Sequence, residues 1–227
     1  MEAPLCCDPK QHIYIFSQLE SIAESTISQC LEVFPKDICD YILRIKHLQG
    51  RREQVAGFLL LAEGLRTFSC SNAHNEIEYV TKLNIPSKEE CAYLLDFIYN
   101  EHGKPSLRNL NGVFFNISNC QRAVAVAIAP YEIGIDIECN RKINKSLIGQ
   151  VCGESEKANI ESSSNPNMAF IRHWTQKEAY VKYTGTGLGQ YGLHQLKDLE
   201  VELRDDIKYK TLPILDGEGF VTIVYQK

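Results

Sequence analysis

The sequence predicts an α+β fold with a pseudo-twofold duplication, in which two similar α+β halves follow one another in one chain. The first observation is a group of three apolar, strand-like runs between residues 113 and 137. The second is a pair of long segments with helical periodicity, one on each side of this group. Each half therefore has strands and one prominent helix, although the halves share little sequence identity. We place an N-terminal half at 1–120 and a C-terminal half at 121–227.

The N-terminal half is predicted to begin with a strand and to contain one long helix. His12–Phe16 is rich in β-branched and aromatic residues, which is typical of a strand. In the helix expected over Arg52–Leu65, apolar residues recur every three or four positions, the spacing of one buried helical face: Val55, Phe58, Leu59, Ala62 and Leu65. The segment Glu89–Tyr99 fits a helix and an extended strand almost equally well, so both alternatives stay open.

The centre and the C-terminal half are predicted to be a strand hairpin or meander followed by helices and closing strands. Pro130 and its neighbours separate the second and third central runs and favour turns between them. A loop containing Gly185, Gly187 and Gly189 ends the last long helix. The expected elements are strands at Val113–Ile117, Ala123–Ala129, Ile133–Ile137, Leu199–Leu203 and Phe220–Tyr225, and helices at Glu154–Glu161 and Met168–Thr184.

Composition excludes several classes of protein. The chain of 227 residues is 44% hydrophobic and can bury its own core. The net charge of −5 argues against a nucleic-acid partner, which normally needs a clustered basic face. The nine cysteines are odd in number and form no C-x-x-C pair, so we expect reduced thiols in a cytoplasmic protein. No long apolar run is present, so we expect neither a signal peptide nor a membrane partner.

Two acidic residues lie on one face of the strand predicted in Gly134-Ile135-Asp136-Ile137-Glu138. Side chains alternate along a strand, so Asp136 and Glu138 share a face with backbone positions about 6.5 Å apart. Two carboxylates at that spacing suit Mg²⁺, which binds hard oxygen ligands beside substrate phosphates. The alternative is a strand whose polar face is simply hydrated.

A second group of polar residues lies on the predicted helix after residue 168. In Trp174-Thr175-Gln176-Lys177-Glu178-Ala179-Tyr180-Val181-Lys182, helical spacing brings Trp174, Glu178 and Lys182 onto one stripe. The alternative is an ordinary surface ion pair between Glu178 and Lys182, with Trp174 filling the core. The glycines after this helix do not form a dinucleotide-binding loop, because such a loop must follow a strand and open a helix.

The combination and order of these motifs resemble the 4′-phosphopantetheinyl transferase superfamily, in particular its larger subclass that activates peptide and polyketide synthetases. The resemblance runs from about Arg52 to Leu188 and also includes Gly103-Lys104-Pro105 and Phe115-Asn116-Ile117-Ser118. It implies two similar α+β halves with coenzyme A bound in a cleft between them. It also implies transfer of the phosphopantetheine group of coenzyme A to a serine of an apo acyl, peptidyl or polyketide carrier protein, by a monomer.

The resemblance further implies roles for individual residues in the metal and catalytic motifs of the C-terminal half. Asp136 and Glu138 would hold Mg²⁺, with Glu178 as a third ligand or as the general base. Lys182 and Lys177 would neutralise charge on the phosphates as the bond to the nucleotide breaks.

In the N-terminal half, the resemblance implies contacts to the nucleotide. Arg52 and Lys104, with the adjoining Pro105, would bind the 3′-phosphate, assisted by Arg44 or Lys46. Ser118 would contact the nucleotide, whereas Asn119 stands where many relatives carry histidine and cannot supply a positive charge.

Two other functions stay open from the sequence. A non-catalytic protein that binds coenzyme A or a carrier protein would keep the scaffold, and Asn119 is the only departure in its favour. An unrelated magnesium-dependent phosphohydrolase would release inorganic phosphate from nucleotides. The sequence does not choose among the carrier proteins.

Overall fold

The computed structural model describes residues 11–68, 77–187, 193–197, 199, 201 and 204–226 of the chain. Its α-helices are α1 (Glu24–Val33), α2 (Lys36–Arg44), α3 (Leu48–Phe68), α4 (Lys88–Leu94), α5 (Lys145–Val151), α6 (Glu154–Ser162), α7 (Pro166–Thr184) and α8 (Leu193–Lys197), with short 3₁₀ turns η1 (Leu19–Ser21) and η3 (Leu215–Gly217). Its strands are β1 (His12–Phe16), β2 (Ile77–Tyr79), β3 (Phe97–Tyr99), β4 (Pro105–Leu107), β5 (Phe114–Cys120), β6 (Ala123–Ala129), β7 (Ile133–Cys139), β8 (Ile207–Ile214) and β9 (Gly219–Gln226).

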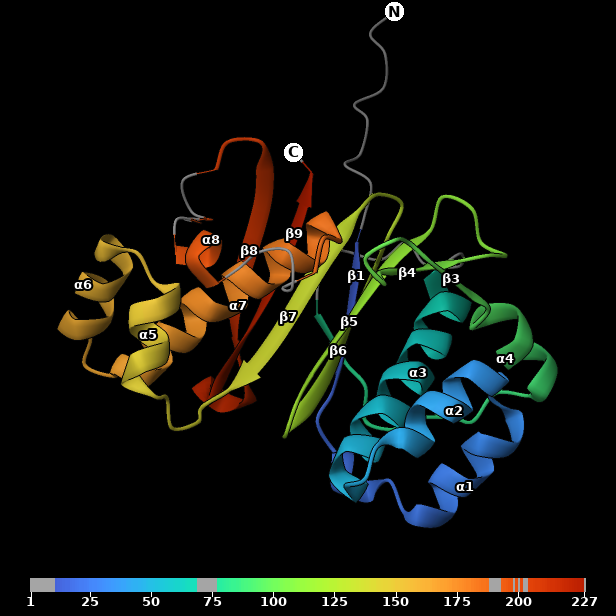
Figure 1. Ribbon diagram of the computed structural model, residues 1–227. Coiled ribbons are helices and arrows are strands. Elements are labelled where there is room, and N and C mark those ends of the chain that lie inside the picture. Colours follow the sequence, from blue (N-terminus) through green and yellow to red (C-terminus); the bar gives the residue numbers. More distant parts are fainter. Residues whose placement is uncertain are drawn as a thin grey trace, which may run out of the picture.

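The strands form two main sheets and a short hairpin. The first sheet has the order β2-β1-β6-β5, and the second has the order β7-β9-β8. All neighbours are antiparallel except β1 and β2, which are parallel, and β3 pairs separately with β4. Figure 1 shows helices α1–α4 beside the first sheet and α5–α8 beside the second, with the two sheets between them. The order of layers is therefore helices, sheet, sheet, helices, which confirms a mixed α+β fold.

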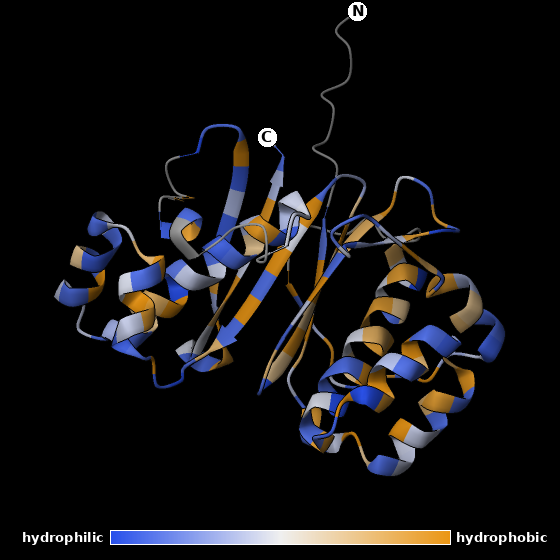
Figure 2. Ribbon diagram, viewed as in Figure 1, coloured by the Kyte–Doolittle hydropathy of each residue, from blue (hydrophilic) through white to orange (hydrophobic). Residues whose placement is uncertain are grey.

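Alternation along β6 explains how one strand can face two cores. Its valines and isoleucine pack against the helices of the first group, whereas its alanines at 123, 125, 127 and 129 face the second sheet. Opposite these alanines lie Ile133, Ile135 and Ile137 of β7, in the same core cluster. Alanine is small, so the sheets can approach closely while the isoleucines exclude water. Figure 2 shows the corresponding alternation of hydrophobic and hydrophilic residues along β7.

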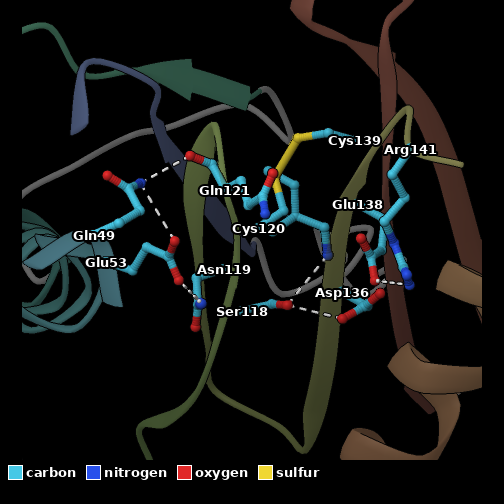
Figure 3. The surroundings of a disulfide bond; sticks show 11 residues. Gln49, Glu53, Ser118, Asn119, Cys120, Gln121, Asp136, Glu138, Cys139 and Arg141 are labelled. Atoms are coloured by element: carbon cyan, nitrogen blue, oxygen red, sulfur yellow. Dashed lines mark hydrogen bonds and ion pairs between the residues drawn. A yellow bond between two sulfur atoms is a disulfide. The ribbon is translucent and has the colours of Figure 1, made fainter. Parts of the chain in front are cut away.

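Side chains, rather than a backbone ladder, join the two sheets. Asn116 of β5 accepts a hydrogen bond from the backbone N–H of Ile135 at 3.0 Å, and Ser118 accepts one from Ile137 at 3.2 Å. At the end of the same two strands, Cys120 and Cys139 are joined by a disulfide (Figure 3). The expectation that all cysteines are reduced thiols is therefore wrong for this pair. The pairing depends on a contact between β5 and β7 that cysteine spacing does not reveal.

Reduction of this disulfide is expected to lower the free energy of unfolding by about 3 kcal/mol. The bond closes a loop with a sequence separation of 19 residues, and opening it increases the conformational freedom of the unfolded chain. Urea unfolding with and without reductant measures the change. The variant Cys120→Ser/Cys139→Ser is the control, because reductant should no longer alter its midpoint. An unchanged midpoint for the unsubstituted protein would contradict the prediction.

Most expected elements are confirmed, with three differences. Glu89–Tyr99 divides into both alternatives, since α4 precedes β3. The central strands do not form one meander, because β5 and β6 form a hairpin whereas β7 pairs with β9 in the other sheet. Of the closing strand expected at Leu199–Leu203, the structure describes only Leu199 and Val201, and neither lies in a strand; the next described strand, β8, begins at Ile207.

The boundary expected after residue 120 falls inside the β5–β6 hairpin, so the first sheet extends to Ala129. Among the residues that the structure describes, no helix is both long enough and apolar enough to cross a membrane. Gly189, expected in the loop after α7, lies outside the described residues.

Candidate functional site

A cavity of about 720 Å³ lies between the two groups of elements. One wall comes from α2, α3, β3, β4 and β5, and the other comes from β7 and α7. Seven predicted site residues line it: Pro105, Ser118, Asn119, Asp136, Glu138, Glu178 and Lys182. Residues from motifs more than forty positions apart therefore meet in one place.

Asp136 is the most deeply buried acid of this cavity, at 4% exposure. Its Oδ1 accepts hydrogen bonds from Lys182 Nζ at 2.7 Å and from Ser118 Oγ at 2.8 Å. Lys182 also donates to Ser118 Oγ at 2.8 Å, which closes a three-membered network. The second oxygen, Oδ2, is buried without a hydrogen-bond partner among the described residues. A buried carboxylate oxygen is costly to leave unpaired, so this atom marks a place where a cation or donor would be stabilised.

Glu138 lies two residues further along β7, on the same face. Arg141 Nη2 contacts its Oε1 at 3.2 Å (Figure 3). Burial raises the pKa of the Glu138 carboxyl, and the negative charge of Asp136 raises it further, whereas Arg141 and Lys182 lower it. The alternation predicted for this strand is thus confirmed, with the acids toward the cavity and the isoleucines in the core.

Glu178 approaches the same cavity from α7. Burial raises the pKa of its carboxyl to about 7, and Asp136 and Glu138 act in the same direction, while Lys182 opposes them. All four of these groups line the same cavity. A carboxyl group with a pKa near neutrality can accept and return a proton at physiological pH.

Close packing of α7 on β7 positions these groups. A Cβ atom at Gly134 would overlap the backbone carbonyl of Ala179 and the backbone nitrogen of Tyr183. Ala179 is itself fully buried. The glycine of one motif and the alanine of the other are therefore small because the helix backbone lies directly against the strand. This contact brings Glu178 and Lys182 beside Asp136.

Gly134→Ala is expected to destabilise the protein by about 3 kcal/mol, because backbone atoms of α7 cannot move as easily as a flexible side chain. Thermal or urea unfolding measures the effect. The control is Gly149→Ala in α5, where an added Cβ meets nothing within 4 Å and alanine favours the helix. Equal stability of the two variants would show that α7 does not require this contact.

The carboxylates at the cavity are the kind of ligand that Mg²⁺ prefers, but their oxygens are not arranged around one point. The described residues contain no group of three His, Cys, Asp or Glu side chains arranged to hold a metal ion. The Lys182 ammonium is the cation that contacts Asp136. The free Oδ2 of Asp136 and the carboxylates of Glu138 and Glu178 face the same cavity. Hard oxygen donors of this kind fit Mg²⁺.

Lys177 is placed away from the cavity, which does not support the phosphate contact expected of it. Its side chain is 1% exposed and forms an ion pair with Glu156 of α6 at 2.9 Å. The ammonium also donates to the carbonyl oxygens of Leu196 and Leu199 at 2.6 and 2.7 Å. One residue along a helix rotates the side chain by about 100°. Lys177 therefore points to α6 and α8 while Glu178 points to the cavity.

The residues expected to bind the nucleotide do not meet in one place. Arg52 does not line the cavity, and its Nε donates to the carbonyl of Ile22 at 3.0 Å. Lys104 lines an adjoining hollow of about 290 Å³, and its ammonium contacts Glu132 at 2.6 Å. Asn119 reaches the main cavity, but its Nδ2 donates to Glu53 at 2.7 Å.

The aromatic wall of the cavity is absent from the predicted site. It consists of Tyr41, Phe58, Phe97, Tyr99 and Phe115. The helical pattern placed Phe58 on a buried face, but periodicity does not distinguish a core contact from a cavity wall. The other aromatic residues come from α2, β3 and β5, and no local signal indicates that these elements meet.

Comparison with known proteins supports one family. The model of the "4'-phosphopantetheinyl transferase superfamily" matches residues 132–225. The chain is 30% identical over 117 residues to "4'-phosphopantetheinyl transferase Sfp" of Bacillus subtilis (strain 168), covering 48% of this chain and 52% of the relative. It is 33% identical over 108 residues to "4'-phosphopantetheinyl transferase gsp" of Aneurinibacillus migulanus, covering 47% and 43%.

A third relative has a similar extent of match. It is "4'-phosphopantetheinyl transferase HetI" of Nostoc sp. (strain PCC 7120 / SAG 25.82 / UTEX 2576), 32% identical over 127 residues, covering 52% of each chain. The chain spans about half the length of the curated relatives it matches.

Proposed function

We propose, because residues 132–225 match the model of the 4′-phosphopantetheinyl transferase superfamily, that the chain transfers the 4′-phosphopantetheine group of coenzyme A to a serine of an apo carrier protein. The leaving group is adenosine 3′,5′-bisphosphate. The observation that carries the proposal is the meeting of Asp136, Glu138, Glu178 and Lys182 in one cavity. These residues come from the two motifs on which the resemblance depends, and their charges suit a diphosphate substrate.

The proposed metal ligands are Asp136 and Glu138, with Glu178 either as a third ligand or as the general base. The unpartnered Oδ2 of Asp136 is the buried donor of this set. Bound Mg²⁺ would supply positive charge to the diphosphate and to the leaving nucleotide. The negative charge that these three acids accumulate in a partly buried cavity favours a cation.

Glu178 and Lys182 are proposed to act on protons and charge. Where Glu178 is the general base, its carboxylate takes the proton of the carrier serine hydroxyl. The serine oxygen then bonds to the phosphorus next to the pantetheine, and the phosphoanhydride bond breaks. Lys182 lies on the same helix face one turn further and neutralises the developing charge on the phosphate oxygens. Lys177 has no part in this mechanism, because it is bound to Glu156.

The test is a transfer assay with purified protein, coenzyme A, Mg²⁺ and several apo carrier proteins. Mass spectrometry should detect carriers heavier by one phosphopantetheine group. Omission of Mg²⁺ with excess chelator should stop the transfer. The absence of a mass shift with acyl, peptidyl and polyketide carriers would contradict the proposal. In that case, binding of coenzyme A without transfer would favour a non-catalytic protein, and release of inorganic phosphate would favour a phosphohydrolase.

The proposed partners are coenzyme A and an apo carrier protein. We propose that the chain acts as a cytoplasmic monomer, because both walls of the cavity come from one chain. Light scattering during transfer measures the oligomeric state, and a dimer that loses activity on dilution would contradict this part of the proposal.

A further inference from the structure

The charges around the cavity bear on which part of coenzyme A is recognised. Besides its diphosphate, coenzyme A carries a 3′-phosphate on the ribose, which is a dianion at neutral pH when its second proton is lost. A protein that selects for such a group needs basic side chains or free N–H donors directed at it. Each one contributes about a 10- to 150-fold difference in affinity.

The side chains expected to contact the 3′-phosphate already have other partners. Arg52 donates through Nε to Ile22, and Lys104 is paired with Glu132 and also donates to the carbonyl of Tyr183 at 2.9 Å. The Nδ2 group of Asn119 donates to Glu53. Arg44 and Lys46 are exposed and do not line the cavity.

The remaining charge of the cavity opposes an additional phosphate. The described lining residues include the acids Asp37, Asp136, Glu138 and Glu178, and one basic residue, Lys182, which contacts Asp136. Asn119 donates to Glu53, so a carboxylate lies directly behind the position at which many relatives carry a histidine. This carboxylate adds a further negative charge near any phosphate bound beside Asn119. A dianion at this end of the cavity would therefore meet acids that no neighbouring base offsets.

The aromatic wall of the cavity can bind a nucleoside without the 3′-phosphate. Tyr41 and Tyr99 line it and are 48% and 58% exposed, so their ring faces remain accessible. An aromatic ring binds a base by stacking, and this contribution does not depend on the phosphorylation of the ribose.

We infer that this protein does not use the 3′-phosphate for recognition, so that 3′-dephospho-coenzyme A is a donor as good as coenzyme A. This inference rests on the proposed function. The step is the same for both donors: the serine oxygen bonds to the phosphorus next to the pantetheine, and the phosphoanhydride bond breaks. The proton of the hydroxyl passes to the base, and the leaving group is AMP instead of adenosine 3′,5′-bisphosphate.

The experiment compares kcat/KM for the two donors with one apo carrier protein, measured by carrier mass. The expected preference for coenzyme A is less than about fivefold, and a larger preference would overturn the inference. Calorimetry with adenosine 3′,5′-bisphosphate and with AMP gives a second measurement that needs no transfer. If neither donor reacts, the proposed function fails. The inference is still tested, because a dissociation constant for AMP more than about fivefold higher than that for adenosine 3′,5′-bisphosphate would overturn it.

A double variant is designed to give the protein a preference for the 3′-phosphate. In Glu53→Gln/Asn119→Lys, an ammonium faces the cavity and the carboxylate that would pair with it is removed. The expected result is a preference of at least about 10-fold for the 3′-phosphorylated ligand in both measurements. The control Asn109→Lys adds the same charge outside the cavity lining and should leave the ratio unchanged. If the double variant gains no preference, the nucleotide does not lie beside Asn119 and the inference is overturned.

Discussion

Asp136→Asn is expected to lower kcat/KM for transfer by at least about 100-fold, even in excess Mg²⁺. Asparagine keeps the shape of the side chain but removes the negative charge and replaces one carboxylate oxygen by an N–H₂ group. The unpartnered Oδ2 would then no longer be available as a hard oxygen donor. Calorimetry with Mg²⁺ and a nonreactive diphosphate should show weaker metal binding in parallel with the loss of transfer.

The fold should survive this change. Lys182 loses its charged partner but still donates to Ser118 Oγ, and its side chain is 29% exposed, so water can solvate its ammonium. The control is Asp96→Asn, the same substitution at an ion pair with Arg108 outside the cavity. It should retain full activity. An Asp136→Asn protein that is folded and transfers at a rate near that of the parent would remove Asp136 from the proposed metal site.

The two motifs of the proposed site were predictable because the side-chain directions in each follow the period of a single strand or helix. Alternation along β7 separates Asp136 and Glu138 from the isoleucines, and the structure confirms it. Helical spacing puts Glu178 and Lys182 on one stripe of α7, and both line the cavity. In each case the side-chain direction follows from the backbone geometry of one element.

The partners of each element were not predictable by the same reasoning. Strand β7 looks like a third strand of a meander, yet its partner β9 is more than eighty residues later. The disulfide of Cys120 and Cys139 has the same origin. Because β7 belongs to the second sheet, it faces β5 of the first sheet through side chains, and the two cysteines meet there. Such contacts depend on which apolar faces pack together in three dimensions. The alanines of β6 can be recognised as a packing face only when the isoleucines of β7 are known to lie opposite them.

Lys177 and Glu178 illustrate the limit of a motif. They are adjacent in the sequence, and both are charged, but one is enclosed by protein and the other faces the cavity. The partner that explains Lys177 is Glu156, on a different helix. A motif identifies residue types at a given spacing, but it does not separate those that hold the fold from those that line the cavity.

Lys177→Met is expected to lower the free energy of unfolding by about 3–5 kcal/mol. Methionine fills much of the same volume, but it leaves the Glu156 carboxylate, whose side chain is 8% exposed, without its ion-pair partner. It also removes the donor to the carbonyls of Leu196 and Leu199, which fastens α8 to α7. Urea unfolding followed by circular dichroism measures the loss. The control Lys36→Met, at a side chain that is 93% exposed, should leave stability nearly unchanged.

A second substitution separates a buried ion pair from a direct catalytic role. In Glu156→Gln/Lys177→Met the unpaired charge is gone, so part of the lost stability should return. Below their unfolding transitions, both variants should transfer at a rate near that of the parent. A phosphate-binding lysine would behave in the opposite way. Lys177→Met would then unfold at the same urea concentration as the parent while losing transfer, and neutralising Glu156 would restore nothing. That outcome would return Lys177 to the role of a phosphate contact and would require α7 to rotate by about 100° relative to the arrangement described above.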